Sequence, residues 1–122
     1  MSGPGTVAGV ELRGDISVVG GRAIVALSGV ADLSTLPTLR DLLMRTVVLH
    51  PDTTVAVDLD GVGVLDDVGL GVLLGMAGRL RERGHDLVVV ATRPAVLDRF
   101  RVTGFDRAVA VVPSLAEVRV AP

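Results

Sequence analysis

The sequence predicts an α/β layer fold with some parallel strands, and three observations support this class. Segments with strand character alternate with segments of helical spacing from residue 22 onward. The run LVVVA at residues 87–91 is continuously apolar, as expected of a strand buried on both faces. Hydrophobic residues make up 49% of the 122 residues and charged residues 21%, so the chain can form a substantial core. Because only 2% of the residues are aromatic, that core is expected to consist of Val, Leu, Ile and Ala.

The N-terminal part is expected to form an arm followed by a hairpin. Residues 1–10 are small and Gly-rich, which is typical of a frayed arm. Residues 16–19 and 22–28 have strand character and flank Gly20-Gly21, a dipeptide that suits a tight turn. These two segments therefore predict neighbouring strands joined by a short turn.

A helix is expected after the hairpin. Ser34 or Thr35 can cap its start, and Pro37 then falls in the first turn, where proline is tolerated. Apolar residues recur along this helix at the spacing of a single face: Leu36, Leu39, Leu42, Leu43 and Val47.

The middle of the chain predicts a strand, a loop and a second helix. Residues 53–59 (TTVAVDL) are rich in β-branched residues and alternate in part, as strands do. The glycine-rich segment GVGVLDDVG at residues 61–69 is expected to form a loop. A helix follows over residues 68–83, and Gly84 is a suitable end for it.

The C-terminal part continues the alternation after the strand at residues 87–91. Pro94 is expected to open a short helix that runs to Phe100, and residues 109–112 to form a last strand. Ser114 then starts a terminal helix containing Leu115, Val118 and Val120. No internal repeat, linker or second domain is visible in the sequence.

Missing residue types exclude several kinds of chemistry. The chain has no cysteine, which excludes disulfides, thiolate metal sites and cysteine nucleophiles. His50 and His85 each stand without a second ligand at metal-binding spacing, so no metal site is expected. All twelve basic residues are arginine, and the lack of lysine argues against a P-loop and against a phosphate-accepting receiver domain. A dinucleotide loop is disfavoured too, because after Gly69 and Gly71 the next glycine, Gly75, comes one position late.

The charge and hydropathy of the chain limit the cellular locations and the classes of binding partner that are expected. The net charge is −2, residues 1–68 carry nine acids against four arginines, and no aromatic stacking platform exists, so direct nucleic-acid binding is not expected. The longest apolar stretch, residues 68–78, is too short for membrane insertion and contains four glycines. The N-terminus lacks the basic region of a secretory signal, which makes a cytoplasmic protein the expectation.

Two adjacent carboxylates, Asp66 and Asp67, lie at the predicted strand-to-helix junction, where ligands of α/β sheets commonly bind. Either of them could cap the following helix, because a carboxylate accepts the free N–H groups of the first turn. Adjacent residues cannot flank a substrate as the paired carboxylates of glycosidases do, so no enzymatic activity and no cofactor are expected. For a single aspartate capping is the favoured interpretation, and two aspartates followed by several glycines shift that interpretation toward a binding surface.

The helix predicted after these aspartates has two different faces. Five apolar residues should face the sheet, namely Leu70, Leu73, Met76, Ala77 and Leu80. Another face is smooth and apolar where the helix begins, and it carries Val68, Gly71, Val72 and Gly75. Glycine destabilises a helix by about 1 kcal/mol relative to alanine. Several glycines therefore indicate close approach, either by the domain's own sheet or by a partner, and both interpretations stay open.

Three segments carry a resemblance to a known family: DDVGLGVL at residues 66–73, RPAVLDRFRVTG at residues 93–104 and GVADLST at residues 29–35. They resemble motifs of the STAS domain family, which includes bacterial anti-sigma-factor antagonists. The family pattern D-S-S-G-L-G-V-L reads DDVGLGVL at residues 66–73, and N- or S-P-x-V-x-x-x-F-x-x-x-G reads RPAVLDRFRVTG at residues 93–104. Upstream, GVADLST at residues 29–35 is similar to the G-x-x-D-x-x-T segment. The similarity covers roughly residues 16–118, nearly the whole chain.

The resemblance implies a STAS-type mixed β-sheet with helices packed mainly on one side. It also implies one STAS domain over residues 16–120, preceded at residues 1–15 by an N-terminal arm that could include a first strand. In this family an unmodified antagonist binds an anti-sigma factor with an ATP-binding kinase fold, which frees the sigma factor. The kinase then phosphorylates the first serine of D-S-S-G, and the antagonist is released. This exchange is called partner switching.

The sequence departs from the family pattern at the phosphorylated position. Asp67 replaces the accepting serine and Val68 replaces the second serine, so the motif has no hydroxyl. Aspartate carries one negative charge, whereas phosphoserine carries about −1.5 to −2, so Asp67 is a partial and permanent mimic of the modified state. Either the domain never binds a kinase-type partner, or its partner has adapted to aspartate. The second hypothesis is favoured, because the surrounding interface features are intact.

We therefore predict a non-enzymatic STAS domain that regulates a sigma factor by binding an anti-sigma factor. The residues expected to contact that partner are Asp32, Asp66, Asp67, Val68, Gly71, Val72 and Gly75. Two alternatives are a STAS subunit of a lipid-transport ABC complex and a small nucleotide-binding sensor. A homodimer is left open.

Overall fold

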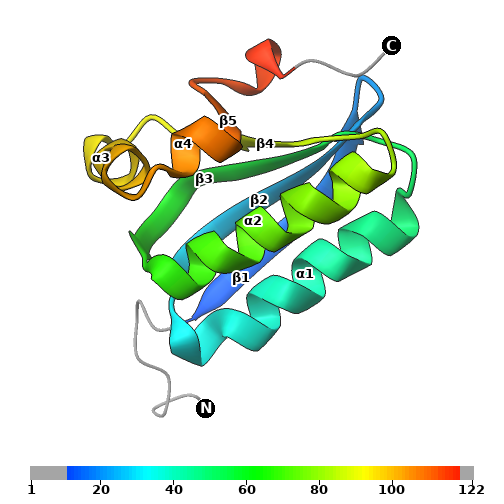
Figure 1. Cartoon of the computed structure of the whole chain (residues 1–122). Helices are drawn as coiled ribbons and strands as arrows, with labels where there is room; N and C mark the ends of the chain where they lie inside the picture. Colours follow the sequence, from blue (N-terminus) through cyan, green and yellow to red (C-terminus); the bar gives the residue numbers. More distant parts are fainter. Residues whose placement is uncertain (1–10, 119–122) are drawn as a thin grey trace, which may run out of the picture.

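Five strands form one mixed sheet in residues 11–118, the part of the chain that the computed structural model describes (Figure 1). Their order is β1-β2-β3-β4-β5, so the strands lie in the sheet as they follow in the sequence. β1 (Leu12–Val19) pairs antiparallel with β2 (Arg22–Ala31). β3 (Val55–Leu65), β4 (Leu87–Val90) and β5 (Ala110–Val112) then add in parallel. The predicted α/β class with parallel strands is confirmed.

The predicted hairpin joins β1 and β2 through Gly20 and Gly21. Both glycines have positive φ, 59° and 77°, which is the backbone of the two-residue turns that match the twist of a hairpin. β1 begins at Leu12, earlier than the strand predicted from residue 16, and β2 continues to Ala31. The arm predicted at residues 1–10 lies outside the described residues.

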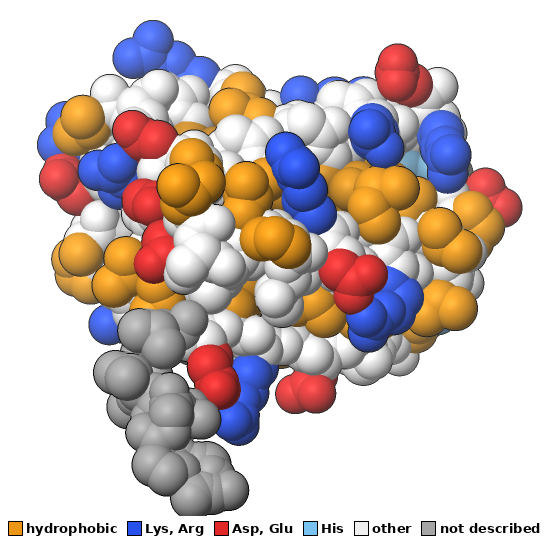
Figure 2. All heavy atoms as spheres, turned by 90° about the horizontal axis from the view of Figure 1, so that it is seen from below, with side chains coloured by type: hydrophobic (Ala, Val, Ile, Leu, Met, Phe, Trp, Pro, Cys, Tyr) orange, Lys and Arg blue, Asp and Glu red, His pale blue; other side chains and the backbone are white. Residues whose placement is uncertain are grey.

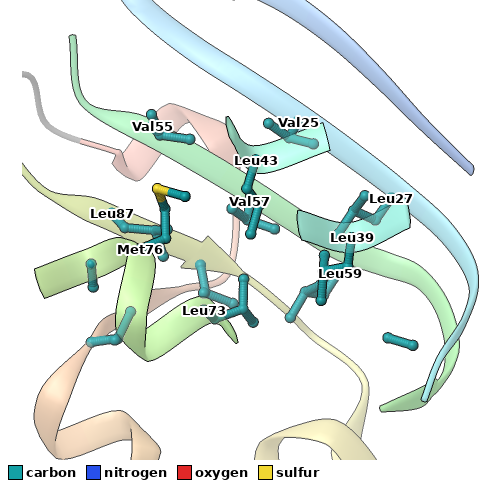
Figure 3. Packing of buried hydrophobic residues seen from close by; sticks show 14 of the residues in the cluster. Val25, Leu27, Leu39, Leu43, Val55, Val57, Leu59, Leu73, Met76 and Leu87 are labelled. Atoms are coloured by element: carbon teal, nitrogen blue, oxygen red, sulfur yellow. The ribbon is translucent and has the colours of Figure 1, made fainter. Parts of the chain in front are cut away.

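Four helices cover one face of the sheet, as the resemblance implied: α1 (Leu36–Leu49), α2 (Asp67–Glu82), α3 (Pro94–Thr103) and α4 (Phe105–Ala108). Figure 3 shows Leu39 and Leu43 of α1 and Leu73 and Met76 of α2 packed over strand residues such as Val57. The core is aliphatic apart from Phe100 and Phe105, which stack with ring centroids 4.7 Å apart. Within residues 11–118, no helix has both the length and the hydrophobicity needed to cross a membrane.

The opposite face of the sheet carries a smaller apolar cluster, which includes Ile24, Ala56, Val88, Val90 and Val118. The terminal helix predicted from Ser114 is only a single 3-10 turn, η2 (Leu115–Glu117). The Arg22 guanidinium donates to the carbonyl oxygens of Leu115, at 3.1 Å, and of Val118. The turn ends at Val118, whose backbone is extended, with φ −75° and ψ 121°. Val120 lies outside the described residues.

The loop predicted at residues 61–69 is wrong except at Asp66, because β3 continues to Leu65 and α2 begins at Asp67. Gly61 and Gly63 belong to this strand. A Cβ atom on Gly61 would lie 2.7 Å from the Leu27 carbonyl oxygen of β2, so glycine here permits close pairing of two strands. The β2–β3 ladder contains two register shifts in this region, which carry both strands on to the edge where the candidate site begins.

The structure also differs from the expectation after β4, in the end of one helix and the presence of another. α3 runs to Thr103, beyond the predicted end at Phe100, and the short helix α4 that follows was not predicted. At four residues, α4 is too short to produce a recognisable periodicity.

Candidate functional site

The residues predicted to form a binding surface begin at one edge of the sheet, where β2 and β3 end. The Asp66 N–H donates to the Ala31 carbonyl oxygen at 3.1 Å, and Ala31 directly precedes Asp32. Because the carboxyl ends of parallel strands meet at the same edge, the start of α2 lies beside the 3-10 turn η1 (Leu33–Thr35) that leads into α1 (Figure 1).

Asp32 caps the η1 turn with its carboxylate. Its Oδ1 accepts hydrogen bonds from the Ser34 hydroxyl at 2.6 Å, the Ser34 N–H at 3.0 Å and the Thr35 N–H at 3.2 Å. The Thr35 hydroxyl accepts from the Asp32 N–H at 3.1 Å and donates to the Val30 carbonyl at 2.7 Å, which completes a capping box. Thr35 is the residue ahead of α1, as predicted, but its side chain does not cap that helix. The carboxylate of Asp32 therefore fixes the turn beside the site.

These contacts lower the pKa of Asp32 from its ordinary value of 3.8, chiefly through the Ser34 hydroxyl and also through the backbone N–H groups of Ser34 and Thr35. A carboxyl group whose pKa is lower in the folded state stabilises the fold above its unfolded pKa. That stabilisation is lost as the pH falls through the folded pKa.

Asp32→Asn should therefore reduce the loss of stability on acidification. The amide keeps an acceptor oxygen for the turn but cannot be protonated in this range. Urea midpoints measured at about pH 6 and about pH 3 should fall less for the variant than for the wild type. Asp52→Asn makes the same change in the exposed turn between α1 and β3 and is the matched control. Equal losses for both variants would contradict this role of Asp32.

Asp66 occupies the position ahead of α2, but neither Asp66 nor Asp67 caps that helix with its side chain, so the capping interpretation of this pair is wrong. The backbone of Asp66 is extended, and its carbonyl oxygen accepts from the Leu70 N–H at 3.2 Å. Its Oδ1 is buried without a hydrogen-bond partner among residues 11–118. A buried acceptor left unpaired is costly in free energy and is uncommon in folded proteins.

Asp67 is the first residue of α2, and its carboxylate forms an ion pair with Arg99 of α3. The distance from Asp67 Oδ1 to the Arg99 guanidinium is 2.5 Å, and the side chains are 73% and 43% exposed, respectively. An exposed pair of this kind contributes about 0–1 kcal/mol to stability. Its effect on the surface is larger, because the negative charge of Asp67 is offset by a guanidinium beside it.

The segment at residues 93–104 positions Arg99 for this contact. The Arg93 guanidinium donates to the Val62 carbonyl of β3 at 2.8 Å, and Phe100 is 1% exposed in the core. Gly104 ends α3 with a φ of 79°. Arg93, Phe100 and Gly104 thus have structural roles in this motif. Arg99 lies between them and was not identified from the sequence. No local pattern indicates that partner, because the pairing depends on how α3 packs beside α2.

The two predicted faces of α2 are confirmed. Leu70, Leu73, Met76, Ala77 and Leu80 are buried against the sheet. The other face borders a groove of about 620 Å³ between α1 and α2, lined by Leu36, Arg40, Met44, Val68, Gly71, Val72, Gly75, Met76 and Arg79. Four of the five residues of α2 predicted to contact a partner line this groove, and the fifth, Asp67, does not.

The glycines of α2 fall into two classes. A Cβ atom on Gly69 would lie 3.0 Å from the Leu65 side chain and 3.5 Å from Ala31, so this glycine packs against the domain itself. A Cβ atom on Gly71, Gly75 or Gly78 would meet nothing within 4 Å. Packing within the domain therefore accounts for Gly69 alone.

A second and smaller hollow, of about 300 Å³, lies on the other side of α2. Its lining consists of Asp67, Leu70, Gly71, Leu74, Thr103, Gly104, Phe105 and Ala108. Gly71 lines both the groove and the smaller hollow, so the first two turns of α2 separate them. No three His, Asp or Glu side chains in residues 11–118 gather in a way that could hold a metal ion.

Comparisons with known proteins agree on one family and one fold. The family model described as "Mlab, STAS domain" matches residues 7–114. The crystal structure of an anti-sigma factor antagonist from Mycobacterium paratuberculosis is 27% identical, covering 87% of this chain and 89% of that chain, with a TM-score of 0.79.

Two more distant structures share the fold. The anti-sigma factor antagonist SpoIIAA in its unphosphorylated form is 17% identical over 86% of this chain and 91% of its own, with a TM-score of 0.70. RsbS from Moorella thermoacetica, in a variant with glutamate in place of a serine, is 20% identical over 86% of this chain and 90% of its own, with a TM-score of 0.68.

Proposed function

The chain belongs to the STAS domain family, and on this premise we propose that it is a cytoplasmic, non-enzymatic regulator that binds an anti-sigma factor with an ATP-binding kinase fold. Its partner-binding surface is the edge formed by Asp32, Asp66 and Asp67 together with the apolar face at the start of α2. The observation that carries the proposal is the Asp67–Arg99 ion pair at the position of the family's phosphorylated serine.

The ion pair favours one of the two hypotheses for Asp67. A lone aspartate would present a fixed negative charge and imitate the phosphorylated, released state in part. With the Arg99 guanidinium 2.5 Å away, the local charge is close to that of a neutral serine. This supports a domain that binds its partner constitutively, with a partner adapted to aspartate, over one that never binds.

The surface around Asp67 also favours a protein partner. Val68 and Val72 are half-buried along the groove. Met44 in the groove and Leu74 in the smaller hollow are each 40% exposed. Apolar side chains beside a polar edge are typical of a recognition surface. We therefore assign apolar contact to Val68 and Val72, and close backbone approach to Gly71 and Gly75.

The test is an affinity capture from the native cytoplasm with three purified baits: the wild type, Asp67→Arg and Asp52→Arg. The two variants make the same change of charge, but Asp52 lies in the turn between α1 and β3 and precedes β3, whereas Asp67 follows it. We expect the wild type and Asp52→Arg to recover the same kinase-fold protein, identified by mass spectrometry, and Asp67→Arg to lose it.

Other outcomes would change the proposal in defined ways. Recovery of a transporter ATPase would assign the chain to a lipid-transport ABC complex. A thermal shift with ATP or GTP in the isolated domain would favour a nucleotide-binding sensor. A kinase-fold partner retained equally by all three baits would contradict the placement of the surface at Asp67. Sedimentation of the wild-type bait would establish whether a homodimer forms.

A further inference from the structure

We propose that the groove between α1 and α2 binds an amphipathic helix of the partner protein, with its apolar side on the glycines of α2 and its carboxylates beside Arg40 and Arg79. This inference rests on the proposed function, because it assigns the chemistry of the partner to the same face of the domain.

The shape of the groove suits a helix. It measures about 620 Å³ and runs between two helices of 14 and 16 residues, so an elongated segment can lie along it. Apolar side chains of both helices line it, including Leu36, Met44 and Val72. Met44 is 40% exposed, and the flexible methionine side chain adapts to the shape of an incoming apolar side chain. Figure 2 views the molecule from below and shows apolar side chains and arginines next to one another on this side.

Because Gly71 and Gly75 have no side chains, the backbone of α2 is exposed where they border the groove. They are four residues apart and therefore lie on the same side of the helix. Neither would contact any atom of the domain within 4 Å if it carried a Cβ atom, so the fold itself does not require glycine at these positions. Glycine within a helix lowers stability relative to alanine. A partner helix that packs directly on the α2 backbone requires the smallest residue at these positions.

The charges bordering the groove select acidic partners. Among residues 11–118, only Arg40 and Arg79 bring charge to its lining. All ion pairs within residues 11–118 involve arginines other than Arg40 and Arg79. Neither of these two guanidinium groups therefore has a carboxylate partner in that part of the chain. Arg79 donates only to the Met44 sulfur, a weak acceptor, at 3.5 Å. Carboxylates on the margins of an incoming helix would satisfy both arginines and fix its register.

A nucleic acid fits this groove less well than an acidic helix. Its floor is apolar, it has no aromatic side chain on which bases could stack, and the whole chain has a net charge of −2. The groove therefore matches a peptide with an apolar face and acidic edges.

The test uses a phage-displayed library of randomised helical peptides selected on the wild-type domain, without any natural partner. We expect the enriched peptides to carry apolar residues at i and i+4 and Asp or Glu beside them. Amide chemical shifts of the domain should change on binding along α1 and α2. A Lys-for-Glu version of the best peptide should bind at least about tenfold more weakly.

Matched variants locate the contact. Gly75→Ala, Arg40→Glu and Arg79→Glu should each raise the Kd of the acidic peptide by about tenfold or more. Gly78→Ala makes the same change on the same helix, at a glycine with equally open space that does not line the groove, and should leave the Kd within about twofold. Thermal melts should show that both glycine variants are folded and at least as stable as the wild type.

Three results would overturn the proposal: enriched peptides without an acidic bias, shift changes away from the groove, or equal binding by Gly75→Ala and the wild type. Because this experiment contains no kinase-fold protein, its failure is distinct from failure of the affinity capture. An acidic helix bound in the groove, together with a captured transporter ATPase, would preserve this inference and reject the anti-sigma-factor assignment.

Discussion

Arg99→Glu is expected to weaken binding of the captured partner by about 100-fold, or about 2.8 kcal/mol. The substitution removes the guanidinium that pairs with Asp67 and places a second carboxylate beside it. Two adjacent carboxylates approach the charge of about −1.5 to −2 that phosphoserine carries. In the family that this chain resembles, phosphorylation at this position releases the partner. The variant should therefore imitate the released state more closely than the wild type.

A graded series separates charge from loss of the side chain. Arg99→Gln leaves the single charge of Asp67 unpaired and should produce an intermediate loss of affinity. Arg101→Glu is the matched control, because it reverses an exposed arginine on the same helix whose ion pair is with Asp98 and not with α2. The exchange of both charges, Asp67→Arg with Arg99→Asp, restores an ion pair but reverses its direction.

Titration calorimetry with the purified partner measures each of these variants. Affinity that falls from Arg99→Gln to Arg99→Glu, with Arg101→Glu unchanged, would support recognition of a neutralised Asp67. If Arg99→Glu bound as tightly as the wild type, the ion pair would have no part in the interface. The charge-swapped double variant then tells whether the partner reads the pair as neutral or requires its orientation.

Most elements could be predicted from the sequence, because their signals are local. The Gly20-Gly21 turn, the apolar run of β4 and the sheet-facing leucines of α2 all follow from backbone geometry or periodicity within a few residues. The errors arose where tertiary contacts override local signals. Gly61 resembles a loop residue but sits in a strand, because β2 and β3 approach too closely for a side chain.

The site was partly predictable for the same reason. Asp32 and Asp66 could be expected near each other, since parallel strands end at one edge, and the Asp66–Ala31 backbone bond joins their segments. Arg99 could not be identified, because its contact with Asp67 depends on the packing of α3 against the sheet. Nor could the sequence distinguish Gly69, which packs on Ala31, from Gly75, which packs on nothing.

Gly29→Ala is expected to be the most destabilising small substitution in the domain, because the backbone at this position has no room for a methyl group. Gly29 has a φ of 106°, and a Cβ atom there would lie 2.0 Å from the carbonyl oxygen of Glu11. That oxygen is held in place because it accepts the Val30 N–H at 2.9 Å. The backbone conformation and the clash together should cost about 2–5 kcal/mol.

The loss should reach the candidate site as well as the global stability. Gly29 begins the segment that leads through Val30, whose carbonyl accepts the Thr35 hydroxyl, to the Asp32 cap. Urea unfolding should show a lower midpoint for Gly29→Ala. Gly78→Ala makes the same change at an open position of a helix and should raise the midpoint, because the free energy of unfolding increases by about 1 kcal/mol. Amide exchange at Ser34 and Thr35 should accelerate more in Gly29→Ala than in a core variant of equal stability, because the clash displaces the strand that carries the cap. If the two glycine variants shifted the midpoint in the same direction, the explanation would be wrong. The close approach of Glu11 would then not account for the glycine at position 29, where the segment GVADLST begins.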